Sequence, residues 1–145
     1  MEQTALAKAA IETIAMVCGQ ELQKGDAYKH HRDSIQNAIA VKLELTGDRT
    51  GTVLIRFNEE NAKKTASAMM MGMPVEDLDD MALSALAELG NMIMGGASIH
   101  LSEAGINTDI TTPTLLKGDI DIKNTISVPI SNNNMRIVLD INISI

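Results

Sequence analysis

The residues of this sequence that could do chemistry together are a carboxylate and a carboxamide three positions apart, Glu88 and Asn91. They lie in residues 84–105, SALAELGNMIMGGASIHLSEAG, whose apolar spacing predicts a helix. On a helix, side chains three positions apart project from the same face. A carboxylate can pair with a cation, and an amide offers both a hydrogen-bond donor and an acceptor. The pair therefore predicts a polar surface that could complement a reactive group on another molecule.

The composition of this predicted helix points to a partner. Gly90, Gly95 and Gly96 each weaken a helix interior by roughly 0.8–1 kcal/mol relative to Ala. At about 100° per residue, one narrow face, here named the ridge, holds Ser84, Glu88, Asn91, Gly95, Ser98 and Ser102. Exposed helix faces normally carry Lys, Glu, Gln or Arg instead. The apolar residues that flank the ridge are Met81, Met92 and Ile99. We therefore expect a partner to cover this surface and to contact Ser84, Met92, Gly95 and Ser98.

Other reactive residues give weaker patterns. His30 and His31 are adjacent and have no third ligand at metal-binding spacing, so no metal site is expected. His100 falls near the buried side of the helix and is expected to be a core histidine, while Cys18 is expected to be a small buried hydrophobe. No glycine-rich phosphate loop follows a strand, and no serine or cysteine motif indicates a nucleophile. A reaction that needs the chain's own nucleophile is disfavoured.

The bulk composition predicts one domain over residues 1–145, with 45% apolar residues. Ten Met against one Phe, one Tyr and no Trp indicate a pliable core without aromatic platforms for bases. The net charge of −7 opposes binding to nucleic acid and to anionic membranes. The lone cysteine suits a reducing compartment, and neither an uninterrupted apolar run nor a signal sequence is evident. We expect a cytoplasmic protein without a membrane segment.

The elements that must position the ridge alternate between helices and strand pairs. Helices are expected over residues 3–20, 59–71 and 80–103, a hairpin over 37–58, and a second strand pair over 124–130 and 135–145. Residues 21–36 are expected to be a loop that holds at most one short strand around Tyr28. The last strand is long, apolar on alternate residues and terminal, which is typical of an edge that becomes paired or covered. The predicted fold class is α+β, with long helices packed on one face of a largely antiparallel sheet.

The sequence also contains an internal similarity. A shift of 76 residues lays AIETIAMVCG, residues 10–19, over LAELGNMIMG, residues 86–95, and matches Glu12 to Glu88. An extended segment and a hairpin follow each of these helices, so the domain is predicted to consist of two similar repeats. The first copy has Ala15 where the second has Asn91.

The spacing Ser84-x3-Glu88-x2-Asn91 resembles the signature of the CheC, CheX and FliY family of chemotaxis phosphatases, which is Asp or Ser, three residues, Glu, two residues, Asn. The segments ELGNMIMGGA, HLSEAG and TPTLLKG look like the CheX branch, and the order of elements follows the family over nearly the whole chain. CheC proteins carry the signature on both repeated helices, CheX proteins only on the later one. The earlier positions here hold Lys8, Glu12 and Ala15. The resemblance thus implies a CheC-like fold with one active ridge.

This resemblance implies an aspartyl-phosphate phosphatase whose partner is a phosphorylated CheY-like response regulator. Asn91 would orient the attacking water, as a Gln does in small GTPases. Glu88 would pair with the receiver's active-site lysine. No cofactor of the chain's own is implied, because the Mg²⁺ would belong to the receiver, and CheX proteins are homodimers, so self-association through sheet edges is expected.

Two alternatives remain open from the residues. The chain could be a non-catalytic docking or scaffold module in chemotaxis or flagellar signalling that uses the same ridge without turnover. It could also be a small-molecule sensor, which would require a ligand pocket between helices and sheet, although nothing in the sequence indicates one.

Overall fold

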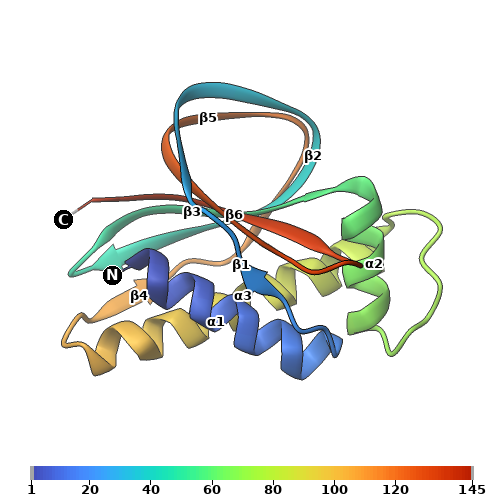
Figure 1. Ribbon diagram of the computed structural model, residues 1–145, viewed down its shortest axis with the longest axis horizontal. Helices are drawn as coiled ribbons and strands as arrows, with labels where there is room; N and C mark the ends of the chain where they lie inside the picture. The colour runs from blue at the N-terminus through green and yellow to red at the C-terminus, as the bar shows by residue number, and fades with distance from the viewer. Residues whose placement is uncertain (1, 145) are drawn as a thin grey trace.

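The fold combines three helices with a six-stranded antiparallel sheet, as the computed structural model describes it for residues 2–144 (Figure 1). The helices are α1 (Glu2–Cys18), α2 (Glu59–Met69) and α3 (Asp80–Glu103). The strands are β1 (Gln23–Lys24), β2 (Tyr28–Gly47), β3 (Thr50–Asn58), β4 (Thr108–Ile110), β5 (Thr114–Ser131) and β6 (Arg136–Ser144). The predicted α+β class is confirmed, and the long helix begins and ends where the sequence placed it.

The three helices lie on one face of the sheet, whose strand order is β1-β5-β6-β3-β2-β4 (Figure 1). Alternate residues of β2 and β3 point toward the helices, which puts Val41, Leu43 and Ile55 in the main core. Asn58 ends β3 and starts α2, where its Oδ1 accepts a hydrogen bond from the backbone N of Asn61 at 2.8 Å. The predicted packing of helices on one face of an antiparallel sheet is therefore confirmed.

Two strands, β2 and β5, are much longer than the sequence predicted. Residues 28–35 of β2 pair with residues 120–127 of β5, and this two-stranded ribbon forms an arch over the face away from the helices (Figure 1). A register shift between Ile35 and Ala38, with Asn37 at φ 52°, separates the arch from the rest of β2. A small second core lies under the arch and consists of Ala38, Ala40, Leu54, Ile120 and Ile122.

The prediction of a loop over residues 21–36 was therefore wrong for its second half. Most side chains of residues 28–37 are exposed, so this part of β2 lacks the alternation that marks a strand covered on one face. Its hydrogen-bonding partner lies more than eighty residues further along the chain, as in the pair Ser34 and Asp121. A local pattern could not indicate such a pairing.

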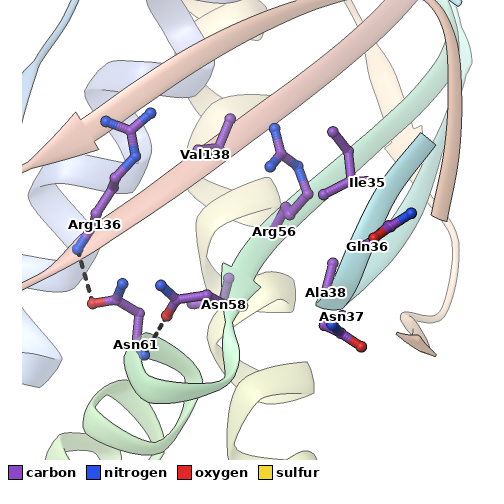
Figure 2. Close-up of a pocket in the computed structure, with 10 residues that line it drawn as sticks. Ile35, Gln36, Asn37, Ala38, Arg56, Asn58, Asn61, Arg136 and Val138 are labelled. Carbon is purple, nitrogen blue, oxygen red and sulfur yellow. Dashed lines mark hydrogen bonds between the residues drawn. The ribbon is translucent and has the colours of Figure 1, made fainter. Parts of the chain in front are cut away.

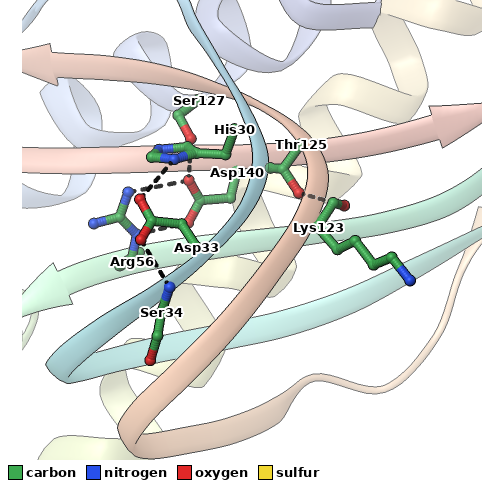
Figure 3. Close-up of polar contacts among 8 residues, drawn as sticks. All are labelled: His30, Asp33, Ser34, Arg56, Lys123, Thr125, Ser127 and Asp140. Atoms are coloured by element: carbon green, nitrogen blue, oxygen red, sulfur yellow. Dashed lines mark hydrogen bonds and ion pairs between the residues drawn. The ribbon is translucent and has the colours of Figure 1, made fainter.

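A network of polar side chains also lies beneath the arch (Figure 3). Asp140 is 1% exposed, and its Oδ2 and Oδ1 accept hydrogen bonds from Nε and Nη2 of Arg56 at 2.7 and 3.1 Å. The hydroxyl of Ser127 donates to Oδ1 of Asp140 at 2.6 Å. On the arch itself, Nδ1 of His30 lies 3.1 Å from Oδ2 of Asp33. The face away from the helices is thus partly covered and internally hydrogen-bonded.

The last strand, β6, lies in the interior of the sheet. It pairs with β3 through Ile141 and Val53 and with β5 through Leu139 and Val128. The expectation of an edge strand was wrong, because β3 and β5 already satisfy both sides of its backbone. This removes the argument that linked the strand to self-association, and the homodimer stays a prediction.

The strand pairings form the same pattern in both halves of the chain. The hairpin β2–β3 corresponds to β5–β6, and the two hairpins meet through the β3–β6 and β2–β5 pairs. The short strand β1 pairs with β5, and its counterpart β4 pairs with β2. Two copies of an α-β-β-β unit would give this arrangement, and the duplication itself stays a prediction.

Among the helices of residues 2–144, α3 is long and apolar enough to cross a membrane by length and composition alone. The sequence does not show this helix as an uninterrupted apolar run, because Ser84, Glu88 and Asn91 interrupt it. The other residues of the helix, many of them Gly and Ala, keep its mean hydropathy high. Most buried side chains of α3, such as Leu86 and Ile93, belong to the main core under the sheet, and Leu101 belongs to a small separate cluster. Core packing accounts for the apolar residues on the buried face of this helix.

Candidate functional site

The helix α3 is held by caps at both ends and by an apolar face. The carboxylate of Asp79 accepts a hydrogen bond from the backbone N of Ala82 at 2.9 Å and caps the first turn. The last turn closes where the N–H of Ile106 donates to the carbonyl of Leu101 at 2.8 Å, with Gly105 at φ 83°. The buried residues are Ala82, Leu86, Leu89, Gly90, Ile93, Met94, Ala97 and Leu101. The ridge is the opposite side of a well-anchored helix.

Ser84, Glu88 and Asn91 are all exposed on α3. Glu88 and Asn91 are separated by three positions of continuous helix, so their side chains project from one face. Within residues 2–144, neither the Glu88 carboxylate nor the Asn91 amide takes part in a hydrogen bond or an ion pair of the fold. Both groups are therefore available to another molecule, as a docking role requires.

The other three predicted contact residues differ in their surroundings. Gly95 faces open space, because a Cβ built there would meet no atom within 4 Å. Met92 is half-buried beside the ridge. The Ser98 hydroxyl lies 2.9 Å from the hydroxyl of Thr108 and 3.2 Å from its carbonyl, so it also ties α3 to β4. The ridge is thus open from Ser84 to Gly95, is tied to β4 at Ser98, and is exposed again at Ser102.

The glycines of α3 have different structural roles. A Cβ on Gly90 would lie 2.7 Å from Cγ1 of Val41, so the absence of a side chain lets α3 lie against the sheet. A Cβ on Gly96 would lie 3.4 Å from Cβ of Ala9 on α1. Close packing accounts for Gly90 and fits Gly96, whereas nothing within the fold accounts for Gly95.

The equivalent face of α1 carries Lys8, Glu12 and Ala15, which are exposed. The Glu12 carboxylate is bound within the fold, since its Oε1 lies 2.8 Å from Nε2 of His100 on α3. The His100 side chain is 24% exposed and lies between the two helices. The expectation of a core histidine was wrong, because the helix turn that carries His100 faces α1 at its solvent edge.

Large apolar side chains are exposed on α3 and in the connection that precedes it. Met81 and Ile99 are 64% and 63% exposed, as the flanking positions predicted. Met71 and Met73, in the connection between α2 and α3, are 97% and 57% exposed, and sequence reasoning did not select them. The signal was present in the run MMMGM at residues 69–73. Flexible Met side chains of this kind suit an adaptable protein contact.

Comparison with solved structures gives the class of this fold. A CheC-like superfamily protein from Shewanella sp. PV-4 superimposes with a TM-score of 0.87 at 21% identity, over 99% of this chain and 97% of that one. The CheX–CheY–BeF3–Mg²⁺ complex from Borrelia burgdorferi contains a chain that matches with a TM-score of 0.83 at 24% identity, over 100% and 99% of the two chains. The architecture is therefore CheC-like.

Sequence comparison gives the family within that class. The family described as chemotaxis phosphatase CheX matches residues 39–137. The CheY-P phosphatase CheX of Thermotoga maritima is 37% identical over 131 residues, which covers 88% of this chain and 84% of that protein. The chain belongs to the CheX family of chemotaxis phosphatases, as the spacing on α3 indicated.

Proposed function

We propose that this chain is a phosphatase that hydrolyses the aspartyl phosphate of a CheY-like response regulator, with Asn91 and Glu88 as the residues that act on the bound receiver. The observation that carries the proposal is the exposed pair of a carboxylate and an amide on one face of α3, without partners in the rest of the described chain. Membership of the CheX family, the Thermotoga relative and the Borrelia complex support the substrate class.

The reaction needs little covalent chemistry from this chain. Water attacks phosphorus in line with the bond between phosphorus and the aspartyl oxygen, that bond breaks, and the products are a carboxylate and inorganic phosphate. The Asn91 amide can accept a hydrogen bond from this water and donate one to a phosphoryl oxygen, which fixes the water in an attacking position. Positioning of this kind is the main protein contribution in phosphoryl transfer.

Glu88 sets the register of the complex in this proposal. Its carboxylate would pair with the lysine of the receiver's active site, one helical turn from the point where Asn91 enters. Ser84, Met92, Gly95 and Ser98 would form the surrounding contact surface. The Mg²⁺ would be bound by the receiver, and the chain itself needs neither a metal nor a nucleophile for this role.

The test is the decay of a phosphorylated receiver from the same organism, measured with wild-type chain, with Asn91→Ala and with Lys8→Gln as a surface control. We expect N91A to lower the catalysed rate by about a hundredfold or more, because water is no longer positioned. Binding of N91A to the receiver should stay within about threefold of wild type. K8Q should match wild type in both measurements.

Two further results separate the proposal from the scaffold alternative. Glu88→Ala should weaken receiver binding roughly ten- to a hundredfold, since a charge-assisted contact contributes about 1.5–3 kcal/mol. A receiver whose phosphate decays equally fast with N91A and with wild type would show that Asn91 does not position the attacking water. The same decay with and without the wild-type chain, despite binding, would show that the ridge docks without catalysing.

A further inference from the structure

A cavity of about 170 Å³ lies on the face of the sheet away from the helices, next to the start of α2 (Figure 2). Its walls come from the bulge of β2, the end of β3, the first turn of α2 and the start of β6. The residues that decide its chemistry are Arg56, Asn58, Asn61 and Arg136. None of them belongs to α3, so the cavity is separate from the proposed phosphatase site.

Hydrogen bonds fix which end of each asparagine amide faces the cavity. Oδ1 of Asn58 accepts from the backbone N of Asn61 at 2.8 Å, and Oδ1 of Asn61 accepts from the backbone N of Arg136 at 3.1 Å. Because both oxygens are engaged, both NH₂ groups remain as the free ends. Figure 2 shows these two nitrogens turned to the same side, away from the hydrogen-bonded backbone.

Two guanidinium groups complete this wall. Arg136 is exposed, and its side chain makes no ion pair within residues 2–144. Arg56 uses Nε and one N–H of Nη2 on Asp140 and also interacts with the side chain of Tyr28, which leaves only part of its five-donor fork for other contacts. Arg56 and Val138 are paired across β3 and β6, and Arg136 lies two residues before Val138 on the same face. Figure 2 shows both arginines beside Val138.

The acidic groups near this wall already have partners. Asp140 is bound by Arg56 and by the hydroxyl of Ser127. Asp119 accepts a hydrogen bond from the backbone N of Asn37 at 3.2 Å. In the first turn of α2, the ion pairs are Glu59 with Lys63 at 3.5 Å and Glu60 with Lys64 at 3.3 Å. The fixed polar groups of the wall therefore present donors, with one uncompensated positive charge at Arg136.

We propose that this cavity binds a small oxyanion, a phosphate or carboxylate group, through the amide nitrogens of Asn58 and Asn61 and the guanidinium of Arg136. A ligand surrounded by donors must supply acceptors, and an anion also balances the charge of Arg136. Guanidinium forks match both phosphate and carboxylate oxygens. In a chain of net charge −7, such a site is local and does not follow from the overall electrostatics.

The test is a titration of the backbone amide NMR spectrum of the full chain with sodium phosphate and, separately, with sodium succinate, at constant ionic strength set by sodium chloride. Three variants lower the net charge by the same one unit: Asn58→Asp, Arg136→Gln and Lys8→Gln. N58D turns the donor into an acceptor while Asp keeps the helix cap, so the fold is preserved. K8Q lies on α1 and controls for net charge alone.

We expect at least one of the two oxyanions to give saturable shifts in residues 36–38, 58–61 and 136–138. The affinity should fall about tenfold or more in both N58D and R136Q and stay unchanged in K8Q. Shifts with only one oxyanion would assign the site to that chemistry. Shifts that do not saturate with either oxyanion, that chloride reproduces, or that persist equally in N58D would overturn the proposal.

Discussion

Glu12 of α1 and His100 of α3 are joined by a contact of 2.8 Å between Oε1 and Nε2. The contact links α1 to α3, the helix that carries Asn91. His100 also has Nδ1 at 3.6 Å from Oε1 of Glu103. The carboxylate on α1 that corresponds in sequence to Glu88 is therefore engaged in packing two helices together. We infer that α1 supports α3 through this contact, and that adding the missing amide to α1 would not give the protein a second active ridge.

The first prediction follows from this contact. Ala15→Asn places an amide on the exposed face of α1, yet it should not rescue the Asn91→Ala variant, because Glu12 is already held by His100. The measurement is receiver dephosphorylation by the double variant N91A/A15N, with A15N alone as a control that should keep wild-type activity. A double variant that regains a substantial part of the wild-type rate would show that α1 can still act.

The second prediction compares two glycines of α3. Gly90→Ala should lower the free energy of unfolding by about 1–3 kcal/mol, because its Cβ would lie 2.7 Å from Cγ1 of Val41 in the core. Gly95→Ala should raise it by up to about 1 kcal/mol, because the site is open and Ala favours helix. Urea unfolding of both variants measures the difference. Equal stability of the two would mean that α3 can move off the sheet without cost.

The helices and the hairpin that position the ridge could be predicted from the sequence, because the patterns that indicate them lie within short segments of the chain. The period of the apolar residues indicated the buried face of α3, and Asn58, which caps α2, is a residue type that accepts from helix N–H groups. The hairpin over 37–58 was predicted from alternation around a turn, and the register of Leu43 with Val53 agrees with it. The exposure of Glu88 and Asn91 followed from the same periodicity.

Long-range pairings were the part that the sequence did not predict. The arch depends on strands such as residues 28–35 and 120–127, whose mutual register is set by contacts across the whole domain. Central placement of β6 required knowledge of both neighbours, and the interhelical position of His100 required the packing angle of α1 on α3. The glycines of α3 also needed the structure, because the sequence does not distinguish Gly90, which packs against the sheet, from Gly95, which faces open space.

The third prediction concerns the ion pair beneath the arch (Figure 3). Burial alone would lower the pKa of Arg56, but the hydrogen bond and the charge of Asp140 outweigh it and raise that pKa. Asp140→Asn leaves Arg56 without its counter-ion and should lower the free energy of unfolding by about 3–5 kcal/mol.

A matched variant distinguishes loss of the pair from loss of packing. The triple change Arg56→Met, Ser127→Ala and Asp140→Leu removes the ion pair together with the hydroxyl that donates to it. It should cost less than D140N, since apolar replacements of a buried pair are often neutral. Urea unfolding of both proteins measures this. A triple variant less stable than D140N would mean that packing, rather than the uncompensated charge of Arg56, dominates at this position.

The fourth prediction is a dependence of stability on pH through Cys18, the single cysteine of the sequence. Cys18 is half-buried rather than fully buried at the end of α1, and burial raises the pKa of its thiol from 9.0 to about 11. Because the folded state holds the proton more tightly, this contribution to stability is fully present below about pH 9 and is lost as pH rises from about 9 toward 11. The free energy of unfolding should therefore fall more steeply over this interval in wild type than in Cys18→Ala.

Subtracting the two curves removes the titration of the lysines and tyrosine, which both proteins share. A difference between them that stays constant from about pH 8 to 11 would show that the thiol ionises equally easily in the folded and unfolded chains.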